Sequence, residues 1–389
     1  MIKSLPYGRQ DIQNEDIKGV IKVLKSDWLT QGPTVEKFEK KVTKFCKSKF
    51  SIASNSATSA LHISCLALGV GKNDKVWTSS NSFVASANCA LYCGAKIDFI
   101  DIDPRNYNMC PESLEIKLKK TSKKNLPKVV IPVHMGGLPC DMIKIYKLSK
   151  KYNFRIIEDA SHAIGARYGK NQKFIVGNCQ HSDITVFSFH PVKIITTGEG
   201  GMSLTNNQKL YEKMQLFRSH GITKNKKLMT KKPDGPWYYQ QINLGYNYRM
   251  NDIEASLGIE QLKRVKSYIR KRNEIAKYYN KKLHCLPINL PKYNNDYKSS
   301  YHLYIITIKK NSKKSRNEIF RYLRKKKILA NVHYIPIHTQ PFFKKLGFTN
   351  GYCPNAENYY YNAISLPIYP KLKKKDQDFV IKCLYDSFK

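Results

Sequence analysis

The chain has 389 residues, a length typical of two domains, and 41% of them are hydrophobic, which is enough for a sizeable core. Its formal net charge of +39 is extreme, but the lysine clusters are short and scattered, and no zinc-finger, basic-zipper or RNA-binding signature accompanies them. We therefore expect a solvated lysine-rich surface, with attraction of an anionic substrate as the second interpretation and no nucleic-acid partner. No apolar run approaches the ~18 residues of a membrane helix, which excludes a membrane-spanning protein.

Cysteine usage indicates the compartment. The ten cysteines are dispersed, and only Cys89 and Cys93 lie close together, four residues apart. There is no CxxC pair and no Cys/His cluster with zinc spacing, so we expect no structural metal. The first twenty residues show no secretory signal. Reduced thiols and a cytoplasmic location are therefore predicted.

Helical and strand-like segments alternate from about residue 10 to residue 260. Helices are predicted at 15–25, 34–46, 57–69, 82–93, 140–151 and 207–219. Short apolar strands are predicted at 50–54, 75–80, 96–103, 128–134, 154–160, 183–189 and 202–206. This alternation predicts βαβ units in a mostly parallel sheet, whose chemistry gathers at the carboxyl ends of the strands.

A different pattern follows. A long charged helix is predicted at 251–283, and then strand 302–309, helix 314–326, strand 330–336 and helix 376–388. We interpret residues 1–260 as a large domain with an N-terminal helical segment, and residues 261–389 as a small α+β domain joined through the long helix.

Three features suggest chemistry. Asp159 ends an apolar strand, where a carboxylate is costly to bury; it either caps a following helix or faces a protonated ring nitrogen. Lys193 lies in FSFHPVKIITTGEGG, between an apolar strand and a Thr/Gly-rich turn, and is either a surface lysine or a partly buried amine with a lowered pKa. SNSATSAL (54–61) opens a helix with small hydroxyl residues, which suits either N-capping or phosphate binding.

The order of these features is more specific than any one of them. A phosphate cradle, then an aspartate after a strand, then a lysine thirty-four residues later is the order expected of an enzyme that uses pyridoxal 5'-phosphate (PLP). Such a cofactor needs a lysine that bonds to its aldehyde and an acid beside its pyridine nitrogen.

At these residues the sequence resembles the DegT/DnrJ/EryC1/StrS sugar-aminotransferase family of fold-type-I PLP enzymes. The matching motifs run from about Tyr7 to the C-terminus and include WLTQGP (28–33), IEDASHAIG (157–165) and LGYNYRMNDIEASLGIEQL (244–262). The resemblance implies an α/β fold, with a large domain built on a mostly parallel seven-stranded sheet, a small C-terminal α+β domain and a homodimer with active sites at the subunit interface. Lys193, rather than the histidine of related dehydratases, favours amino transfer.

The resemblance also implies site residues. Lys193, Asp159 and His162 match catalytic positions, and Ala57, Thr58, Phe83, Ser188 and Asn247 match the cofactor shell. Asn247 resembles the residue that reaches the cofactor of the neighbouring subunit. Each also has a structural interpretation: Phe83 as core, His162 as a satisfied buried histidine, Asn247 as a helix cap, and His333 with Tyr334 as packing. Matches to nucleotide-sugar contacts are Tyr7, Asp27, Trp28, Leu29, Thr30, Ala57, Ser188, Asn247, His333, Tyr334, Ile335, Pro336 and Ile337.

The segments PDGPWYY (233–239) and NVHYIPIHTQPFF (331–343) resemble one branch of the family, that of pseudaminic acid biosynthesis. This branch implies transfer of an amino group from L-glutamate to C4 of a UDP-4-keto-6-deoxy-N-acetyl-hexosamine. The alternative is the same chemistry on another nucleotide-linked keto sugar, at a different epimer or at C3. A catalytically silent relative is disfavoured because Lys193 and Asp159 are both present.

Overall fold

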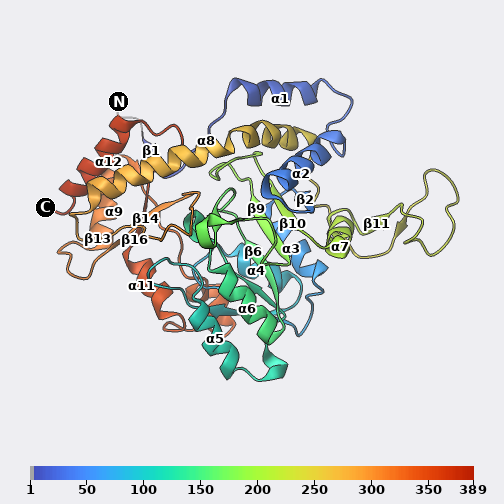
Figure 1. Cartoon of the computed structure of the whole chain (residues 1–389), viewed down its shortest axis with the longest axis horizontal. Coiled ribbons are helices and arrows are strands. Elements are labelled where there is room, and N and C mark those ends of the chain that lie inside the picture. Colours follow the sequence, from blue (N-terminus) through green and yellow to red (C-terminus); the bar gives the residue numbers. More distant parts are fainter. Residues whose placement is uncertain (1–3) are drawn as a thin grey trace.

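The computed structural model describes residues 4–389. A seven-stranded sheet forms its centre (Figure 1), in the order β2-β10-β9-β6-β5-β3-β4. All neighbouring pairs are parallel except those of β10, which is antiparallel to both β2 and β9. The predicted mostly parallel seven-stranded sheet is therefore confirmed. Its strands are β2 (Phe50–Ser54), β3 (Lys75–Ser79), β4 (Lys96–Ile100), β5 (Val129–Ile131), β6 (Arg155–Asp159), β9 (Ile184–Ser188) and β10 (Gly201–Thr205).

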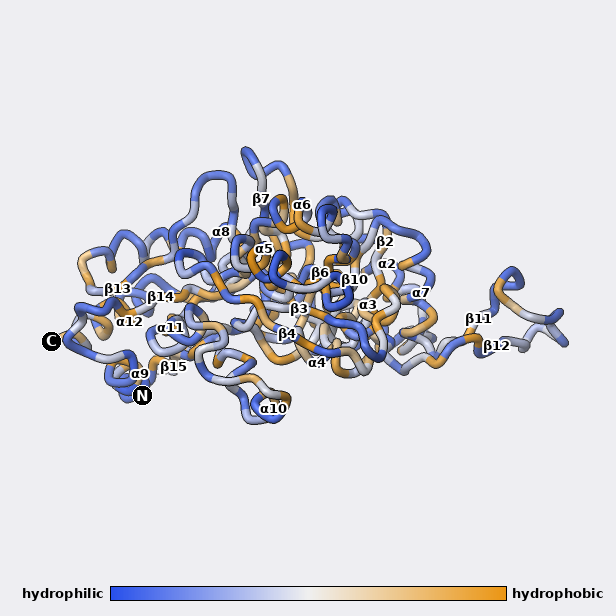
Figure 2. The backbone as a smooth tube through the Cα atoms, turned by 90° about the horizontal axis from the view of Figure 1, so that it is seen from below, coloured by the Kyte–Doolittle hydropathy of each residue, from blue (hydrophilic) through white to orange (hydrophobic). Residues whose placement is uncertain are grey.

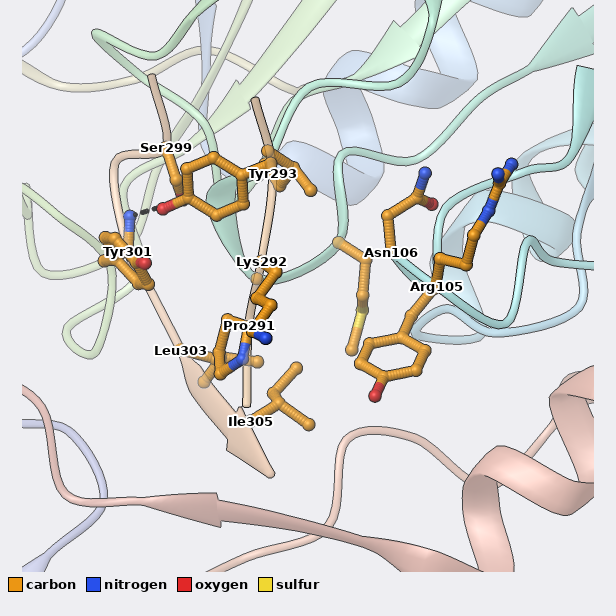
Figure 3. Close-up of a pocket in the computed structure, with 13 residues that line it drawn as sticks. Arg105, Asn106, Pro291, Lys292, Tyr293, Ser299, Tyr301, Leu303 and Ile305 are labelled. Atoms are coloured by element: carbon orange, nitrogen blue, oxygen red, sulfur yellow. Dashed lines mark hydrogen bonds between the residues drawn. The ribbon is translucent and has the colours of Figure 1, made fainter. Parts of the chain in front are cut away.

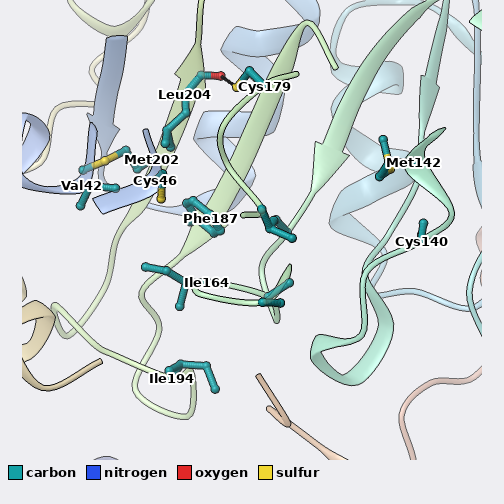
Figure 4. Packing of buried hydrophobic residues seen from close by; sticks show 14 of the residues in the cluster. Val42, Cys46, Cys140, Met142, Ile164, Cys179, Phe187, Ile194, Met202 and Leu204 are labelled. Atoms are coloured by element: carbon teal, nitrogen blue, oxygen red, sulfur yellow. Dashed lines mark hydrogen bonds between the residues drawn. The ribbon is translucent and has the colours of Figure 1, made fainter. Parts of the chain in front are cut away.

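Helices cover both faces of this sheet, because neighbouring strand residues point to opposite sides. Ile156 packs in one buried cluster and Ile157 in the other. The first cluster, seen in Figure 4, lies under α2 (Pro33–Cys46), α5 (Pro111–Lys120), α6 (Met142–Tyr152) and the first half of α8 (Asp252–Leu283). The second lies under α3 (Ala57–Ala67), α4 (Ala85–Tyr92) and α7 (Gln208–Arg218). Outside α8 lies α1 (Asn14–Leu24).

A third buried cluster belongs to the C-terminal part of the chain. It runs from Ile275 on α8 to Leu384 and includes Leu5. Helix α8 continues unbroken through the predicted boundary between residues 260 and 261, so that boundary stays a prediction. The elements here are β13 (Ile288–Asn289), β14 (Tyr304–Ile308), α9 (Arg316–Lys325), β15 (Ile328–Leu329), α10 (Pro341–Lys345), α11 (Pro354–Asn362), β16 (Ala363–Leu366) and α12 (Lys374–Asp386).

The two ends of the described chain meet in this part. β1 (Leu5–Pro6) pairs in parallel with β15, and the backbone N–H of Ile368 donates to the carbonyl of Tyr7 at 2.9 Å. These bonds bring Tyr7 to the junction between the two parts of the molecule.

The strand predicted at 330–336 is wrong. Among residues 330–336, Asn331 alone bridges to another residue of the described range 4–389, Ser365, and the chain then leaves the sheet. The physical reason is that His333 and Ile337 pack inward against other parts of the molecule, while Pro336 has no N–H to donate to a strand partner.

A two-stranded hairpin projects from the large domain (Figures 1 and 2). Its strands are β11 (Ile222–Thr223) and β12 (Gln240–Gln241), and the loop between them extends away from the rest of the chain.

The remaining elements are β7 (Arg167–Tyr168), β8 (Phe174–Ile175) and the 3-10 helices η1 (Lys123–Asn125), η2 (Met135–Gly137), η3 (Lys170–Gln172) and η4 (Ile337–Thr339). Within residues 4–389, no helix combines the length and apolarity needed to span a membrane.

Candidate active site

A cavity of about 510 Å³ lies at the carboxyl ends of β6 and β9. Residues 331–334 and Tyr7 also line it. This is the position expected for a ligand site in an open α/β sheet. Among its lining residues are ten that the sequence singled out: Tyr7, Ala57, Thr58, Phe83, Asp159, His162, Ser188, Lys193, His333 and Tyr334.

Lys193 follows β9 and sits in a turn that is held to the strand by hydrogen bonds. Its N–H donates to the His190 carbonyl at 2.9 Å, and the Thr196 hydroxyl donates to the Phe189 carbonyl at 2.9 Å. Among residues 4–389, none forms a hydrogen bond with its Nζ. Burial lowers the pKa of Lys193 to about 8, and the nearby charge of Asp159 partly opposes this shift. The amine is therefore available as a base or nucleophile close to neutral pH.

Asp159 ends β6 and is only 5% exposed. Its carboxylate accepts hydrogen bonds from the hydroxyls of Ser86 and Ser161, both at 2.6 Å, and from the Ser161 N–H at 3.1 Å. The helix-cap interpretation of Asp159 is wrong, because the residues after it form turns and no helix begins there. Asp159 instead lines the cavity as a buried carboxylate, which Ser86 and Ser161 hold in place.

The start of α3 forms one end of the cavity. Ser56 caps the helix by accepting a hydrogen bond from the Ser59 N–H at 3.1 Å, and Ala57 and Thr58 follow it as the first helical residues. The first N–H groups of a helix have no partner within the helix and attract anions. Gly201 lies so near that a Cβ there would stand 2.4 Å from the Ser56 carbonyl oxygen and 2.5 Å from the Ala57 nitrogen. Because Gly201 has no side chain, β10 can approach the start of α3 closely. Gly201 is also paired with Ser188 of β9.

Histidine and aromatic rings line the middle of the cavity. The Tyr334 hydroxyl lies 3.2 Å from Nε2 of His162, and the His162 and His302 ring centres are 4.3 Å apart. Burial, and then the positive charge of Lys193, lowers the pKa of His333 to about 3 and that of His162 well below its ordinary value. These histidines are therefore neutral at physiological pH. Nδ1 of His162 is buried and has no hydrogen-bond partner within residues 4–389.

Several predicted contacts lie outside this cavity. Asn247 is exposed, and its backbone bridges to Ser219. Ile335 is exposed, and Ile337 packs in the core, its N–H bound to the Ser80 carbonyl at 2.9 Å. The other predicted contacts outside it are Asp27, Trp28, Leu29, Thr30 and Pro336. Their roles remain predictions.

Sequence reasoning gave no role to several neighbours of the site, and four of them bear on its chemistry. His302 and Glu199 line the cavity, and Ser86 and Ser161 hold Asp159. Ser161 lies two residues after Asp159, a spacing at which a serine commonly bonds the aspartate, so this contact could have been found. Glu199 lies in the FSFHPVKIITTGEGG segment, but the pattern gave no indication of its role, and Ser86 and His302 carried no local signal.

A second cavity, of about 40 Å³, lies between residues 105–107 and the strand β14 (Figure 3). Its wall includes Leu303 and Ile305, and the Ser299 hydroxyl accepts a hydrogen bond from the Tyr301 N–H at 3.0 Å. Its size excludes a substrate as large as a nucleotide sugar.

The residues of the large cavity fit PLP. An amine without a hydrogen-bond partner in residues 4–389, a buried carboxylate and the open start of a helix all line one cavity. When bound, PLP supplies an electron-accepting ring that stabilises negative charge on the carbon next to an amine. This fold and this site define a PLP-dependent aminotransferase.

The chain belongs to the DegT/DnrJ/EryC1/StrS aminotransferase family, whose model matches residues 10–385. It is 40% identical over 382 residues to the UDP-4-amino-4,6-dideoxy-N-acetyl-beta-L-altrosamine transaminase of Campylobacter jejuni subsp. jejuni serotype O:2, covering 98% of this chain and 96% of that one. The predicted family, fold class and enzyme class are therefore confirmed.

Solved structures support the same family and fold. The structure of Helicobacter pylori PseC, an aminotransferase involved in the biosynthesis of pseudoaminic acid, superposes with a TM-score of 0.89 at 32% identity, over 99% of each chain. The PLP form of the putative sugar aminotransferase Spr1654 from Streptococcus pneumoniae superposes with a TM-score of 0.89 at 29% identity, over 99% of this chain and 98% of that one. The same protein has also been solved in a PMP form. The predicted PLP dependence is confirmed.

Proposed function

We propose that the large cavity binds PLP through the residues that the sequence singled out. The start of α3 at Ala57 and Thr58, with Ser188, holds the phosphate. Asp159 accepts a hydrogen bond from the protonated pyridine nitrogen, while Phe83 and His162 cover the two faces of the ring. The support for these roles is that all of these side chains line one cavity.

Lys193 moves the proton in this proposal. In the first half of the reaction its amine takes a proton from the donor carbon that carries the amino group, and in the second half it delivers a proton to the sugar carbon that receives the amino group. Burial keeps the pKa values of three histidines low, those of His162, His302 and His333. Lys193 is therefore the strongest base among these four groups. The enclosing rings also exclude water from the reacting carbon.

The substrate is proposed to be a UDP-linked 4-keto-6-deoxy-N-acetyl-hexosamine, aminated at C4 with L-glutamate as the donor to give UDP-4-amino-4,6-dideoxy-N-acetyl-β-L-altrosamine. The observation that carries this proposal is the 40% identity, over nearly the full length of both chains, to the Campylobacter transaminase that is named for this product. Tyr7, His333 and Tyr334 line the same cavity as Lys193 and are the proposed sugar contacts.

The test is incubation of the purified enzyme with L-glutamate and a panel of UDP-4-keto sugars, followed by NMR of the product. The expected result is a C4 amine with the altro configuration, formed only when glutamate is present. Preferential amination of another epimer, or at C3, would replace this substrate with the alternative one. No amination of any nucleotide sugar would refute the proposal.

We also propose that the active enzyme is a homodimer. Large apolar side chains are exposed on α1, on the segment after it and on the hairpin, and exposed apolar surface of this kind marks interfaces. They are Ile17, Ile21, Leu24, Trp28, Leu29, Trp237, Tyr239 and Leu244. The hairpin leads directly to Asn247, which supports the proposed reach of Asn247 to the neighbouring cofactor.

A further inference from the structure

The two oxygens of the Asp159 carboxylate have different surroundings. Oδ1 accepts two hydrogen bonds, from the N–H and the hydroxyl of Ser161. Oδ2 accepts one within residues 4–389, from the hydroxyl of Ser86 at 2.6 Å. A carboxylate oxygen has two lone-pair sites, so Oδ2 keeps one for a further donor.

Ser86 is itself fixed. It is fully buried in the first turn of α4, and its hydroxyl lies 2.7 Å from the hydroxyl of Ser82, which lines the cavity. The single hydroxyl proton of Ser86 is directed at Asp159, so Ser82 must donate to Ser86. The order of donation is therefore Ser82 to Ser86 to Asp159, and each bond strengthens the next.

We propose that Ser86 is a positioning residue, which holds Asp159 so that the free lone pair of Oδ2 receives the pyridine N–H of PLP. This inference depends on the cofactor role proposed for Asp159. The same turn of α4 follows Phe83, so one helix start places both the ring-covering aromatic and the donor that orients the carboxylate.

A hydrogen bond to the ionised carboxylate stabilises its charged form. Without the Ser86 hydroxyl, Asp159 becomes more basic and draws the shared proton away from the ring nitrogen. The ring then withdraws electrons less strongly. As a result, the Lys193 nitrogen that is bonded to the cofactor becomes more basic. The pH midpoint of the absorbance change of the bound cofactor should therefore move upward.

The experiment measures this midpoint in the PLP-loaded enzyme, together with PLP affinity. Ser86→Ala is expected to raise the midpoint by about half a pH unit or more and to weaken PLP binding several-fold. Ser86→Thr keeps a hydroxyl and is expected to restore the wild-type midpoint. The other titratable groups near Asp159, which are Lys193, Tyr334 and Cys140, are unchanged in both variants.

Ser64→Ala is the matched control. Ser64 is also a fully buried helical serine, and its hydroxyl donates to the Ala60 carbonyl at 2.6 Å, away from Asp159. The pH midpoint of the Ser64→Ala variant should equal that of the wild type. If Ser86→Ala does not fold, Ser82→Ala removes the donor to Ser86 and should give a smaller shift in the same direction.

An unshifted midpoint in Ser86→Ala, or in Ser82→Ala where only that variant folds, would overturn the proposal. So would an equal shift in Ser64→Ala, or a failure of Ser86→Thr to restore the midpoint. These measurements need no sugar, so they are independent of the proposed substrate. A wild-type enzyme that binds no PLP would refute the proposed cofactor site instead.

Discussion

At the scale of single residues, Lys193 combines properties that the many surface lysines lack. Its amine faces an enclosed cavity, no residue of 4–389 bonds its Nζ, and burial lowers its pKa to about 8. The sequence predicted both Lys193 and Asp159, because Asp159 ends an apolar strand, Lys193 follows another, and each lies in an unusual motif. Ser86 could not be predicted, since a serine in the first turn of a helix gives no sign of which distant side chain it will meet.

Replacing Lys193 with alanine removes the group that moves the proton. We expect amino transfer to fall by about a hundredfold or more, the usual contribution of a general base, and the absorbance of lysine-bound PLP to disappear. Stopped-flow absorbance with glutamate measures both. Normal transfer by this variant would exclude Lys193 from the mechanism.

The lowered pKa of Lys193 also predicts a pH dependence of stability. Between pH 8 and 10.5 the unfolded chain binds a proton at this lysine that the PLP-free folded chain does not. The free energy of unfolding therefore rises with pH across this window. Below pH 8 the folded chain carries the buried charge, and its full destabilising effect is present. Lys193→Met should therefore raise the urea midpoint of the PLP-free protein at pH 7, with little difference at pH 10.5.

Lys266→Met, at an exposed lysine, is the control and should change neither midpoint relative to the wild type. An equal gain from Lys193→Met at both pH values would contradict the predicted charge burial.

At the scale of elements, the start of α3 and the strand β10 act together. The sequence indicated a helix opened by hydroxyl residues, but its close contact with Gly201 depends on the antiparallel pairing of β10 between β2 and β9. Local patterns do not carry such pairings. The failed strand at 330–336 has the same origin, because inward packing against the cavity replaced the pairing that the sequence suggested.

Gly201→Ala tests this contact. A Cβ there would meet the backbone of Ser56 and Ala57 below 3 Å, so the first turn of α3 must shift. We expect PLP binding to weaken by about tenfold or more, comparable to losing one hydrogen bond to a charged group. Equilibrium titration of PLP-free enzyme measures it. Gly71→Ala, with no neighbour within 4 Å of its Cβ, should bind PLP normally, and equal affinity in both variants would refute the argument.

At the scale of the whole molecule, the projecting hairpin is poorly explained by a monomer. Trp237 is 74% exposed, and the resemblance alone, rather than composition, predicted a dimer. Light scattering should give a mass near twice 45.0 kDa for the wild type. Trp237→Ser should shift the equilibrium toward monomer and lower activity in parallel.

The control for the hairpin variant is Ile116→Ser, which removes an exposed apolar residue from α5. It should leave the mass unchanged. A monomeric wild type with full activity would show that the site is complete within one chain.

The pairing of β1 with β15 has a practical consequence. Since Tyr7 contributes to the cavity wall directly after β1, a deletion that reaches this strand would both detach the opening segment and open the site. Engineering at this end should therefore spare Leu5 to Tyr7.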